Sequence, residues 1–176
     1  WMNSMKEWHN VTVADSVKSL VIDGMKFVFV PYVYPGRFVE ALDTIGEDWK
    51  DSQCIFAHQE FEGCKMGAIT SLEGDKWSST LPPVVSGHIH SKQTLVNNVF
   101  YPGTPMQHAF GESETNIIAF LNFETHGEKY ILEELKMKLP KKKILYIDIS
   151  DLSKYNKPDT EDKVRLTVSG TYEQFK

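Results

Sequence analysis

Cysteine is scarce in this 176-residue chain, which contains only Cys54 and Cys64. Neither residue belongs to the paired spacing of a cysteine-based metal site, and such a low content suits a reducing cytoplasm better than a disulfide scaffold. We therefore expect both thiols to be free. Stability has to come from an ordinary apolar core, for which a composition of 41% apolar residues is sufficient.

Long apolar runs are also absent. No window approaches the roughly 18 to 20 apolar residues that a membrane-spanning helix requires, and the first residues do not form a secretion signal. We therefore expect a soluble, intracellular protein with no membrane partner. Positive charge is not in excess either, because 19 Lys and Arg stand against 24 Asp and Glu. Without a global field that attracts a polyanion, any contact with nucleic acid has to be local.

The chain opens in an unusual way. Its first residue is Trp1, and residues 1–8 have the spacing of an amphipathic helix that is already under way. This pattern favours a fragment of a longer protein over a natural start at Met2.

Short apolar runs alternate with turn-forming residues along the chain. We expect strands over residues 11–14, 19–23, 25–30, 54–57, 84–86, 94–101, 116–123 and 129–138. Asp23-Gly24 predicts a tight hairpin, and the apolar spacing over residues 38–49 predicts a helix. Residues 59–81 are expected to form a long loop. The strands over residues 94–101, 116–123 and 129–138, with turns at Asn97-Asn98 and His126-Gly127, would build a second sheet. The pattern is typical of an α/β sandwich.

A change of composition at Lys141-Lys142-Lys143 indicates a boundary near Pro140. We expect residues 1–139 to form one domain and residues 140–176 to form a linker and the beginning of a second unit. Two further strands are expected there, over residues 144–149 and 164–169. This stretch is too short for a complete domain, so we expect the chain to be cut at this end as well.

Three of the six histidines stand where predicted buried strands end. His58 follows the strand over residues 54–57, and His88 and His90 follow the strand over residues 84–86. Sites in open α/β sheets gather at the carboxyl ends of strands. In Gly87-His88-Ile89-His90, both imidazoles can face one side while the isoleucine faces the other, and the glycine permits close approach. Because neutral imidazole binds manganese, iron, zinc or nickel, these histidines are candidate metal ligands.

Plainer interpretations compete with each candidate. A single histidine after a strand, such as His58, is often a hydrogen-bonding loop residue, and His108 fits a structural polar role. His126 is expected in an exposed turn. Lys141 to Lys143 could contact a DNA backbone or simply be solvated. The aromatic residues on strand patterns are assigned to the core, namely Phe27, Phe29, Phe56, Phe120 and Phe123.

Several segments resemble a known family. Phe56-Ala57-His58-Gln59 and Ser86-Gly87-His88-Ile89-His90 are similar to the last two motifs of the calcineurin-like metallophosphoesterases. Tyr101-Pro102-Gly103-Thr104-Pro105, with Phe110-Gly111-Glu112 after it, resembles the next segment of the SbcD-type nuclease branch, most closely in the recombination endonuclease subunits of T-even-like phages. The resemblance covers most of residues 1–139, and the region from Lys143 resembles the start of that family's DNA-facing cap domain.

This resemblance implies a two-sheet sandwich flanked by helices, with two divalent metal ions that are commonly Mn²⁺. His58 and His88 would bind one ion, and His90 would bind the other. The family's three earlier motifs, Asp-x-His, Gly-Asp-x-x-Asp and Gly-Asn-His-Asp/Glu, supply the bridging aspartate and the catalytic histidine. None of them occurs in this sequence, so no catalytic residue is assigned to it.

The resemblance also implies an activity and its partners. The intact protein would be a nuclease that hydrolyses DNA in recombination or repair, works with a coiled-coil ABC-type ATPase and lies in the host cytoplasm if a phage encodes it. A homodimer is a further expected assembly, and no DNA-contacting residue is assigned. This chain alone is expected to be inactive. Two alternatives stay open: a calcineurin-like phosphatase of a protein or small phosphoester, and a non-catalytic scaffold fragment.

Overall fold

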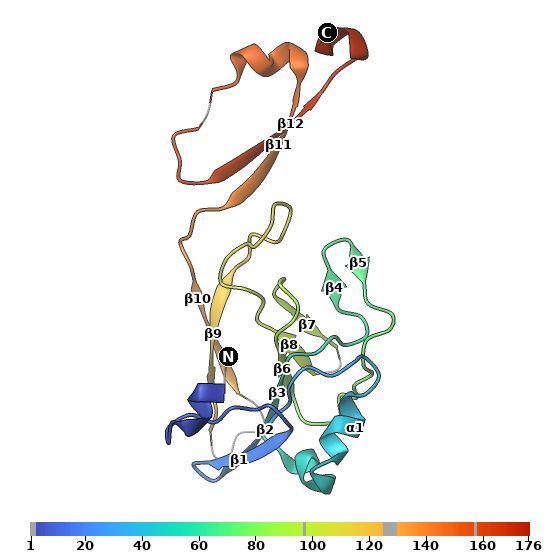
Figure 1. The fold of residues 1–176 in the computed structure, drawn as a ribbon, viewed down its shortest axis with the longest axis vertical. Helices are drawn as coiled ribbons and strands as arrows, with labels where there is room; N and C mark the ends of the chain where they lie inside the picture. Colours follow the sequence, from blue (N-terminus) through green and yellow to red (C-terminus); the bar gives the residue numbers. More distant parts are fainter. Residues whose placement is uncertain (1–2, 97, 125–129, 157) are drawn as a thin grey trace.

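The centre of the protein is a six-stranded mixed sheet (Figure 1). A computed structural model describes residues 3–96, 98–124, 130–156 and 158–176. The strand order is β1-β2-β3-β6-β8-β7, with β2, β3, β6 and β8 parallel and the two edge strands antiparallel. The strands are β1 (Lys18–Ile22), β2 (Met25–Phe29), β3 (Cys54–Ala57), β6 (Val84–Ser86), β7 (Gln93–Leu95) and β8 (Val99–Tyr101). The predicted α/β class is confirmed, although helices are few.

The hairpin that joins β1 to β2 has the predicted turn. Asp23 and Gly24 have φ values of +50° and +79°, as a two-residue turn of this kind requires. The chain before the hairpin differs from the prediction. A 3-10 helix, η1 (Asn3–Glu7), replaces the expected helix, and residues 11–14 form no strand because no neighbouring segment in the described residues pairs with them.

The predicted helix over residues 38–49 is divided in two. The α-helix α1 (Phe38–Asp43) is followed by a 3-10 helix, η2 (Gly46–Asp51). Gly46 has a φ of +76°, a left-handed conformation that ends an α-helix. The apolar face survives the break, because Phe38, Leu42 and Trp49 are all buried in the main core.

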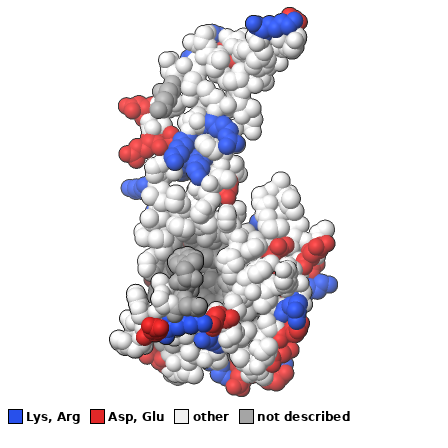
Figure 2. All heavy atoms as spheres, in the orientation of Figure 1, with Lys and Arg blue, Asp and Glu red and all other residues white. Residues whose placement is uncertain are grey.

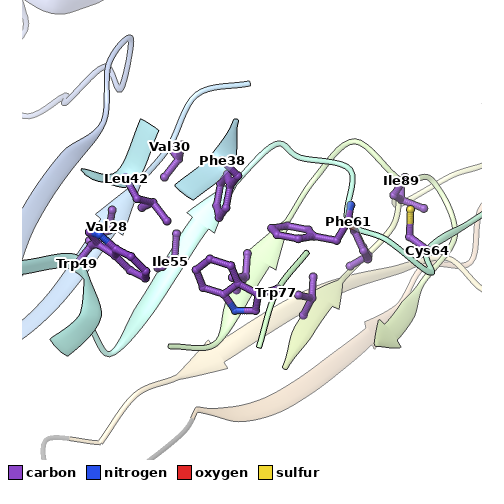
Figure 3. Packing of buried hydrophobic residues seen from close by; sticks show 13 residues of the cluster. Val28, Val30, Phe38, Leu42, Trp49, Ile55, Phe61, Cys64, Trp77 and Ile89 are labelled. Atoms are coloured by element: carbon purple, nitrogen blue, oxygen red, sulfur yellow. The ribbon is translucent and has the colours of Figure 1, made fainter. Parts of the chain in front are cut away.

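The main core lies on one face of the six-stranded sheet (Figure 3). The ring of Phe38 makes edge contacts with Phe61 and Trp77, at centroid distances of 5.0 and 5.5 Å. Both partners come from residues 59–81, the predicted loop, in which only a small hairpin forms, from β4 (Lys65–Met66) and β5 (Ile69–Thr70). The loop is therefore a structural part of the core and not only a surface connection.

The other face of the sheet is covered by an antiparallel pair, β9 (Ile117–Asn122) and β10 (Ile131–Lys136). A second cluster joins the two layers, with Phe27, Cys54, Val85, Phe100 and Ile117 at its centre. The prediction of a second sheet is confirmed for these two strands. It is wrong for residues 94–101, which turn back on themselves and join the first sheet as β7 and β8.

Among the aromatic residues assigned to the core, Phe27 is buried, and Phe29, Phe56 and Phe123 pack against its cluster. Phe120 is 51% exposed, because it lies on the outward face of β9, so its assignment to the core is wrong. Residues 97, 126 and 127, at which turns are predicted, lie outside the described residues.

Both cysteines are free, as predicted, and the structure shows that both are buried. Burial raises the pKa of Cys54 to about 12 and also raises that of Cys64, so both side chains are protonated thiols at neutral pH. Within the described ranges, no helix is long and apolar enough to cross a lipid bilayer.

The chain after Pro140 forms a separate two-stranded sheet. β11 (Lys142–Asp148) and β12 (Lys163–Ser169) pair in parallel, and two 3-10 helices, η3 (Ile149–Lys154) and η4 (Tyr172–Phe175), follow them. Figure 1 shows this sheet extending away from the rest of the protein. The two strands match the prediction closely, whereas the assignment of residues 1–139 and 140–176 to two domains stays a prediction.

Candidate metal centre

His58 and His88 meet at the carboxyl edge of two adjacent parallel strands. β3 pairs with β6, and the last pair in the register joins Ala57 to Ser86, so the residues that follow leave the sheet side by side. The centroids of the two imidazoles are 5.2 Å apart, and the rings are nearly perpendicular. The structure thus brings together two of the three histidines that the sequence predicts as metal ligands.

The spacing of these two rings is compatible with a shared ion. With metal–nitrogen bonds of about 2.1 Å and a near-tetrahedral angle, the centroids of two coordinating imidazoles lie roughly 5 Å apart. Burial, and to a smaller extent the neighbouring His88, lowers the pKa of His58. A lowered pKa favours the neutral imidazole, which is the form that binds a metal.

Tyr32 is a member of this site that the sequence did not reveal. It follows β2, the next strand of the parallel set, and its ring stacks on His88 at 5.7 Å and meets the edge of His58 at 6.5 Å. The only available signal was its position just after a buried strand. Its aromatic ring covers one side of the histidine pair.

A buried polar network holds the loop that carries His58. The hydroxyl of Ser86 accepts a hydrogen bond from the backbone N–H of Gln59 at 2.8 Å and donates to its carbonyl at 2.9 Å. The hydroxyl of Tyr101 also donates to this carbonyl, at 3.0 Å, and accepts from the N–H of Phe61 at 2.9 Å. These bonds fix the backbone directly after His58 to β6 and β8.

The side chain of Gln59 extends the same network. Its amide donates to a carboxylate oxygen of Asp75 at 2.6 Å and accepts from the N–H of Val33 at 3.2 Å. The other carboxylate oxygen of Asp75 accepts from the N–H of Phe38 at 2.9 Å. Gln59 and Asp75 are almost completely buried, so the start of α1, the chain after β2 and the loop after β3 are held together by paired polar groups.

Gly87 is required for the position of His58. A Cβ atom at residue 87 would lie 2.7 Å from Nδ1 of His58, which is closer than non-bonded atoms approach. The φ of Gly87 is not in the left-handed region, so its backbone tolerates alanine. A side chain here therefore perturbs the imidazole and little else.

We expect Gly87→Ala to lower the Mn²⁺ affinity of the intact protein by about 10- to 100-fold, because it would turn the imidazole of His58, a predicted ligand, and disturbing the orientation of a ligand has effects of this size. The thermal unfolding midpoint should stay nearly unchanged. Gly170→Ala is a matched control, since its Cβ would meet Ile149 at the same 2.7 Å but far from any candidate ligand. Calorimetric titration with Mn²⁺ measures the effect. Equal affinities for the two variants would show that His58 does not take part in binding.

The backbone of His88 is held in an uncommon conformation. Its φ is +74°, a region that residues other than glycine seldom occupy. The next residue, Ile89, is buried in the main core, and it lines the same cavity as His88 and His90. Nε2 of His88 lies 4.0 Å from a carboxylate oxygen of Glu60.

His90 belongs to a different cluster, which the loop after β8 supplies. Its Nδ1 lies 2.8 Å from Oε1 of Glu112, and its ring lies 5.0 Å from that of His108. The other oxygen of Glu112 accepts hydrogen bonds from the N–H groups of His108 and Ala109. The sequence did not assign Glu112 to the site, and His108, for which a structural role was predicted, lies directly beside His90.

The charge of Glu112 fixes the chemistry of this pair. Partial burial of the carboxyl is the largest single influence and opposes ionisation, but hydrogen bonds from His90, Ala109 and His108 outweigh it and lower the pKa of Glu112 to about 2. An ionised carboxylate only accepts hydrogen bonds, so Nδ1 of His90 carries the proton. In the neutral imidazole with this tautomer, the lone pair on Nε2 of His90 is free to bind a metal, as in many carboxylate–histidine–metal arrangements.

His88 of the first cluster and His90 of the second line a common cavity of about 440 Å³, whereas His58 is not part of its lining. His88, His90, Phe110 and Glu112 line it, together with Lys65 and Met66 of the β4–β5 hairpin. Within the described ranges, no group of three or more His, Cys, Asp or Glu side chains is arranged to hold a metal ion. The residues present therefore fit a metal centre in part, as two incomplete ligand sets, and the predicted roles of His58, His88 and His90 stay predictions.

Comparison with known proteins shows that the chain is similar to proteins of two viruses. No family model matches the chain. It is 47% identical over 180 aligned positions to "Putative phosphoesterase 244L" of Invertebrate iridescent virus 6, an alignment that includes 100% of this chain and 64% of the viral protein. It is also 47% identical over 180 positions to "Putative phosphoesterase 078R" of Invertebrate iridescent virus 3, with 99% and 51% coverage.

The chain thus spans between half and two thirds of the length of these relatives. Identity at this level over the whole chain establishes common ancestry. The similarity supports a phosphoesterase family for this protein, as the homologue of viral proteins that carry that name.

Proposed function

We propose that this chain forms the C-terminal part of a two-metal phosphodiesterase domain of the metallophosphoesterase type. His58 and His88 hold one ion, and His90 holds the other. The observation that carries the proposal is the convergence of His58 and His88 at the ends of β3 and β6. The names of the two viral relatives support phosphoester hydrolysis independently.

Each residue of the site has a distinct task in this proposal. A pair of metal ions, when bound, supplies a nucleophilic hydroxide and neutralises charge on the phosphoryl group. His58 is kept neutral and therefore able to coordinate. Tyr32 covers the histidine pair and limits access of water to it. Glu112 holds the proton of His90 on Nδ1 and so presents Nε2 to the cavity.

The finer proposal is a DNA nuclease of the SbcD type that uses Mn²⁺. The segment over residues 101–112, which resembles that branch, supplies His108 and Glu112 to the site, and this placement favours the nuclease branch over a general phosphatase. The coiled-coil ATPase partner, the homodimer and a location in the host cytoplasm are further parts of the proposal that rest on the resemblance alone.

The three lysines near the boundary give this proposal little support. Figure 2 shows basic side chains gathered over the β11–β12 sheet, with acidic ones beside them. Lys141 pairs with Glu114 and Lys143 with Asp162, while the ammonium of Lys142 donates to the carbonyl of His108. Since all three are engaged within the chain, the plainer interpretation of them as surface residues of the protein is favoured.

The test uses the protein produced from the complete reading frame, incubated with Mn²⁺. We expect cleavage of linear duplex DNA and of bis(p-nitrophenyl) phosphate, and we expect a chelator to abolish both. Hydrolysis of p-nitrophenyl phosphate alone would contradict the nuclease and support the alternative, a phosphatase. The cavity has room for such a small phosphoester. Failure to hydrolyse any of the three, or hydrolysis that a chelator leaves intact, would rule out the proposed function and favour a scaffold.

A further inference from the structure

Gln107 connects the C-terminal sheet to the loop of the site. Its side chain is only 4% exposed and forms three hydrogen bonds. Nε2 donates to the carbonyls of Glu112 at 3.0 Å and of Lys142 at 3.2 Å, and Oε1 accepts from the N–H of Lys142 at 2.8 Å. Both amide hydrogens and the amide oxygen are therefore used.

The geometry of these bonds resembles that of a β-sheet. The side-chain amide both donates to and accepts from Lys142, as a residue of a neighbouring antiparallel strand would do. Lys142 is the first residue of β11. Gln107 thus occupies the place of a strand partner at the beginning of the C-terminal sheet, and its position depends on where β11 lies.

The same amide closes the turn that presents Glu112. Within residues 107–112, the carboxylate of Glu112 accepts from two backbone N–H groups of the turn, and Gln107 holds the carbonyl of Glu112 itself. The other oxygen of this carboxylate, Oε1, forms the hydrogen bond with Nδ1 of His90. A continuous chain of hydrogen bonds therefore leads from the backbone of β11 through Gln107 and Glu112 to His90.

The other contacts between the two parts are exposed, among them the hydrogen bond from the ammonium of Lys142 to the carbonyl of His108. The guanidinium of Arg165 lies 4.4 Å from the centroid of the Phe110 ring, and Lys141 pairs with Glu114. Exposed ion pairs contribute little, because solvent screens them and long side chains lose freedom when they form. The side-chain amide of Gln107, by contrast, is buried, forms hydrogen bonds of 2.8 to 3.2 Å, and has each of its donors and its acceptor paired.

We propose that Gln107 is a positioning residue, through which the C-terminal sheet holds Glu112 against His90 and so fixes the tautomer of that imidazole. The inference rests on the proposed function for its consequence, namely that Nε2 of His90 is a metal ligand. The positioning itself can be measured on the metal-free chain.

The first readout is the tautomer of His90, measured by nitrogen-15 NMR of the metal-free chain in alkaline buffer, where imidazoles are neutral. Gln107→Met removes all three hydrogen bonds at nearly constant volume. We expect His90 to carry its proton on Nδ1 in the unaltered chain and to shift to a mixture dominated by the Nε2–H form in the variant. Gln107→Glu is the second variant, which keeps the bond from Lys142 but loses both donated bonds, and its expected shift is in the same direction.

Gln93 offers a matched control, because its side-chain amide makes the same two-way pair with Lys65, at 2.8 and 2.9 Å, without touching Glu112 or His90. Gln93→Met should leave the His90 tautomer unchanged. A tautomer that is unaffected in both Gln107 variants, or equally affected in Gln93→Met, would overturn the proposal.

The second readout is the Mn²⁺ concentration for half-maximal phosphodiester hydrolysis by the intact protein. Loss of an outer-shell partner of a metal ligand typically weakens metal binding by 10- to 100-fold. We expect an increase of about this size for Gln107→Met, with kcat at saturating Mn²⁺ within about twofold of the unaltered enzyme. A tautomer shift without this increase would establish the positioning and refute the role of His90 as a ligand, so failures of the two proposals are distinguishable.

Discussion

Replacing His88 with asparagine should lower metal-dependent phosphoester hydrolysis by the intact protein by about 1,000-fold or more. A bound metal supplies several kcal/mol of transition-state stabilisation, and each 1.36 kcal/mol corresponds to about a factor of ten in rate. Asparagine is chosen because it accepts the left-handed conformation of residue 88, so the backbone is retained when the imidazole is lost. Initial rates with bis(p-nitrophenyl) phosphate at saturating Mn²⁺ measure the effect.

His90→Ala should have an effect of the same order on cleavage of DNA, because the second ion loses its ligand from this chain. The side chain of His90 is half exposed, so the fold should be largely intact. His9→Ala is the control, since this exposed histidine lies near η1 and outside the site. Full activity in either site variant, with the metal requirement retained, would remove that histidine from the centre.

The largest loss of stability is expected at Asp75. Asp75→Ala removes the acceptor for two buried donors, the N–H of Phe38 and the side-chain amide of Gln59. Each buried donor without a partner costs about 1–3 kcal/mol, so the loss of the acceptor for two donors should lower the free energy of unfolding by about 2–6 kcal/mol. For a chain of this size, the unfolding midpoint should fall by roughly 10 °C. Thermal unfolding followed by circular dichroism measures the change.

Asp151→Ala is the matched control for this prediction. Asp151 forms an exposed pair with Lys154 three residues later, and such pairs contribute less than about 1 kcal/mol. Its loss should leave the midpoint almost unchanged. If the alanine variants at positions 75 and 151 unfolded at the same temperature, the buried network around Gln59 would not stabilise the fold in the way described.

Much of the fold could be predicted, because it depends on local pattern. The short apolar runs over residues 54–57 and 84–86 form buried strands, and Asp23-Gly24 forms the hairpin turn, since both signals act within a few residues. Predictions failed where the outcome depends on distant partners. Residues 11–14 have the alternation of a strand but form none, and no described segment pairs with them. Gly46 ended a helix that the apolar spacing alone would continue.

The site was predictable to a similar extent. His58 and His88 could be placed together because the ends of buried parallel strands meet at one edge of a sheet. Glu112 could not be assigned to His90, because the two are 22 positions apart and are joined only by the turn that Gln107 holds. Tyr32 and the network of Gln59, Asp75 and Tyr101 were missed for the same reason. Their partners are remote in sequence, and no spacing rule links them.

The central claim is that the imidazoles at the ends of β3 and β6 bind one metal ion. The most direct measurement is anomalous X-ray diffraction from crystals of the intact protein grown with Mn²⁺, at a wavelength where manganese scatters anomalously. We predict a peak within bonding distance of a ring nitrogen of both His58 and His88, and a second peak beside Nε2 of His90. Peaks that avoid these three side chains, in crystals of protein that hydrolyses phosphodiesters, would contradict the claim.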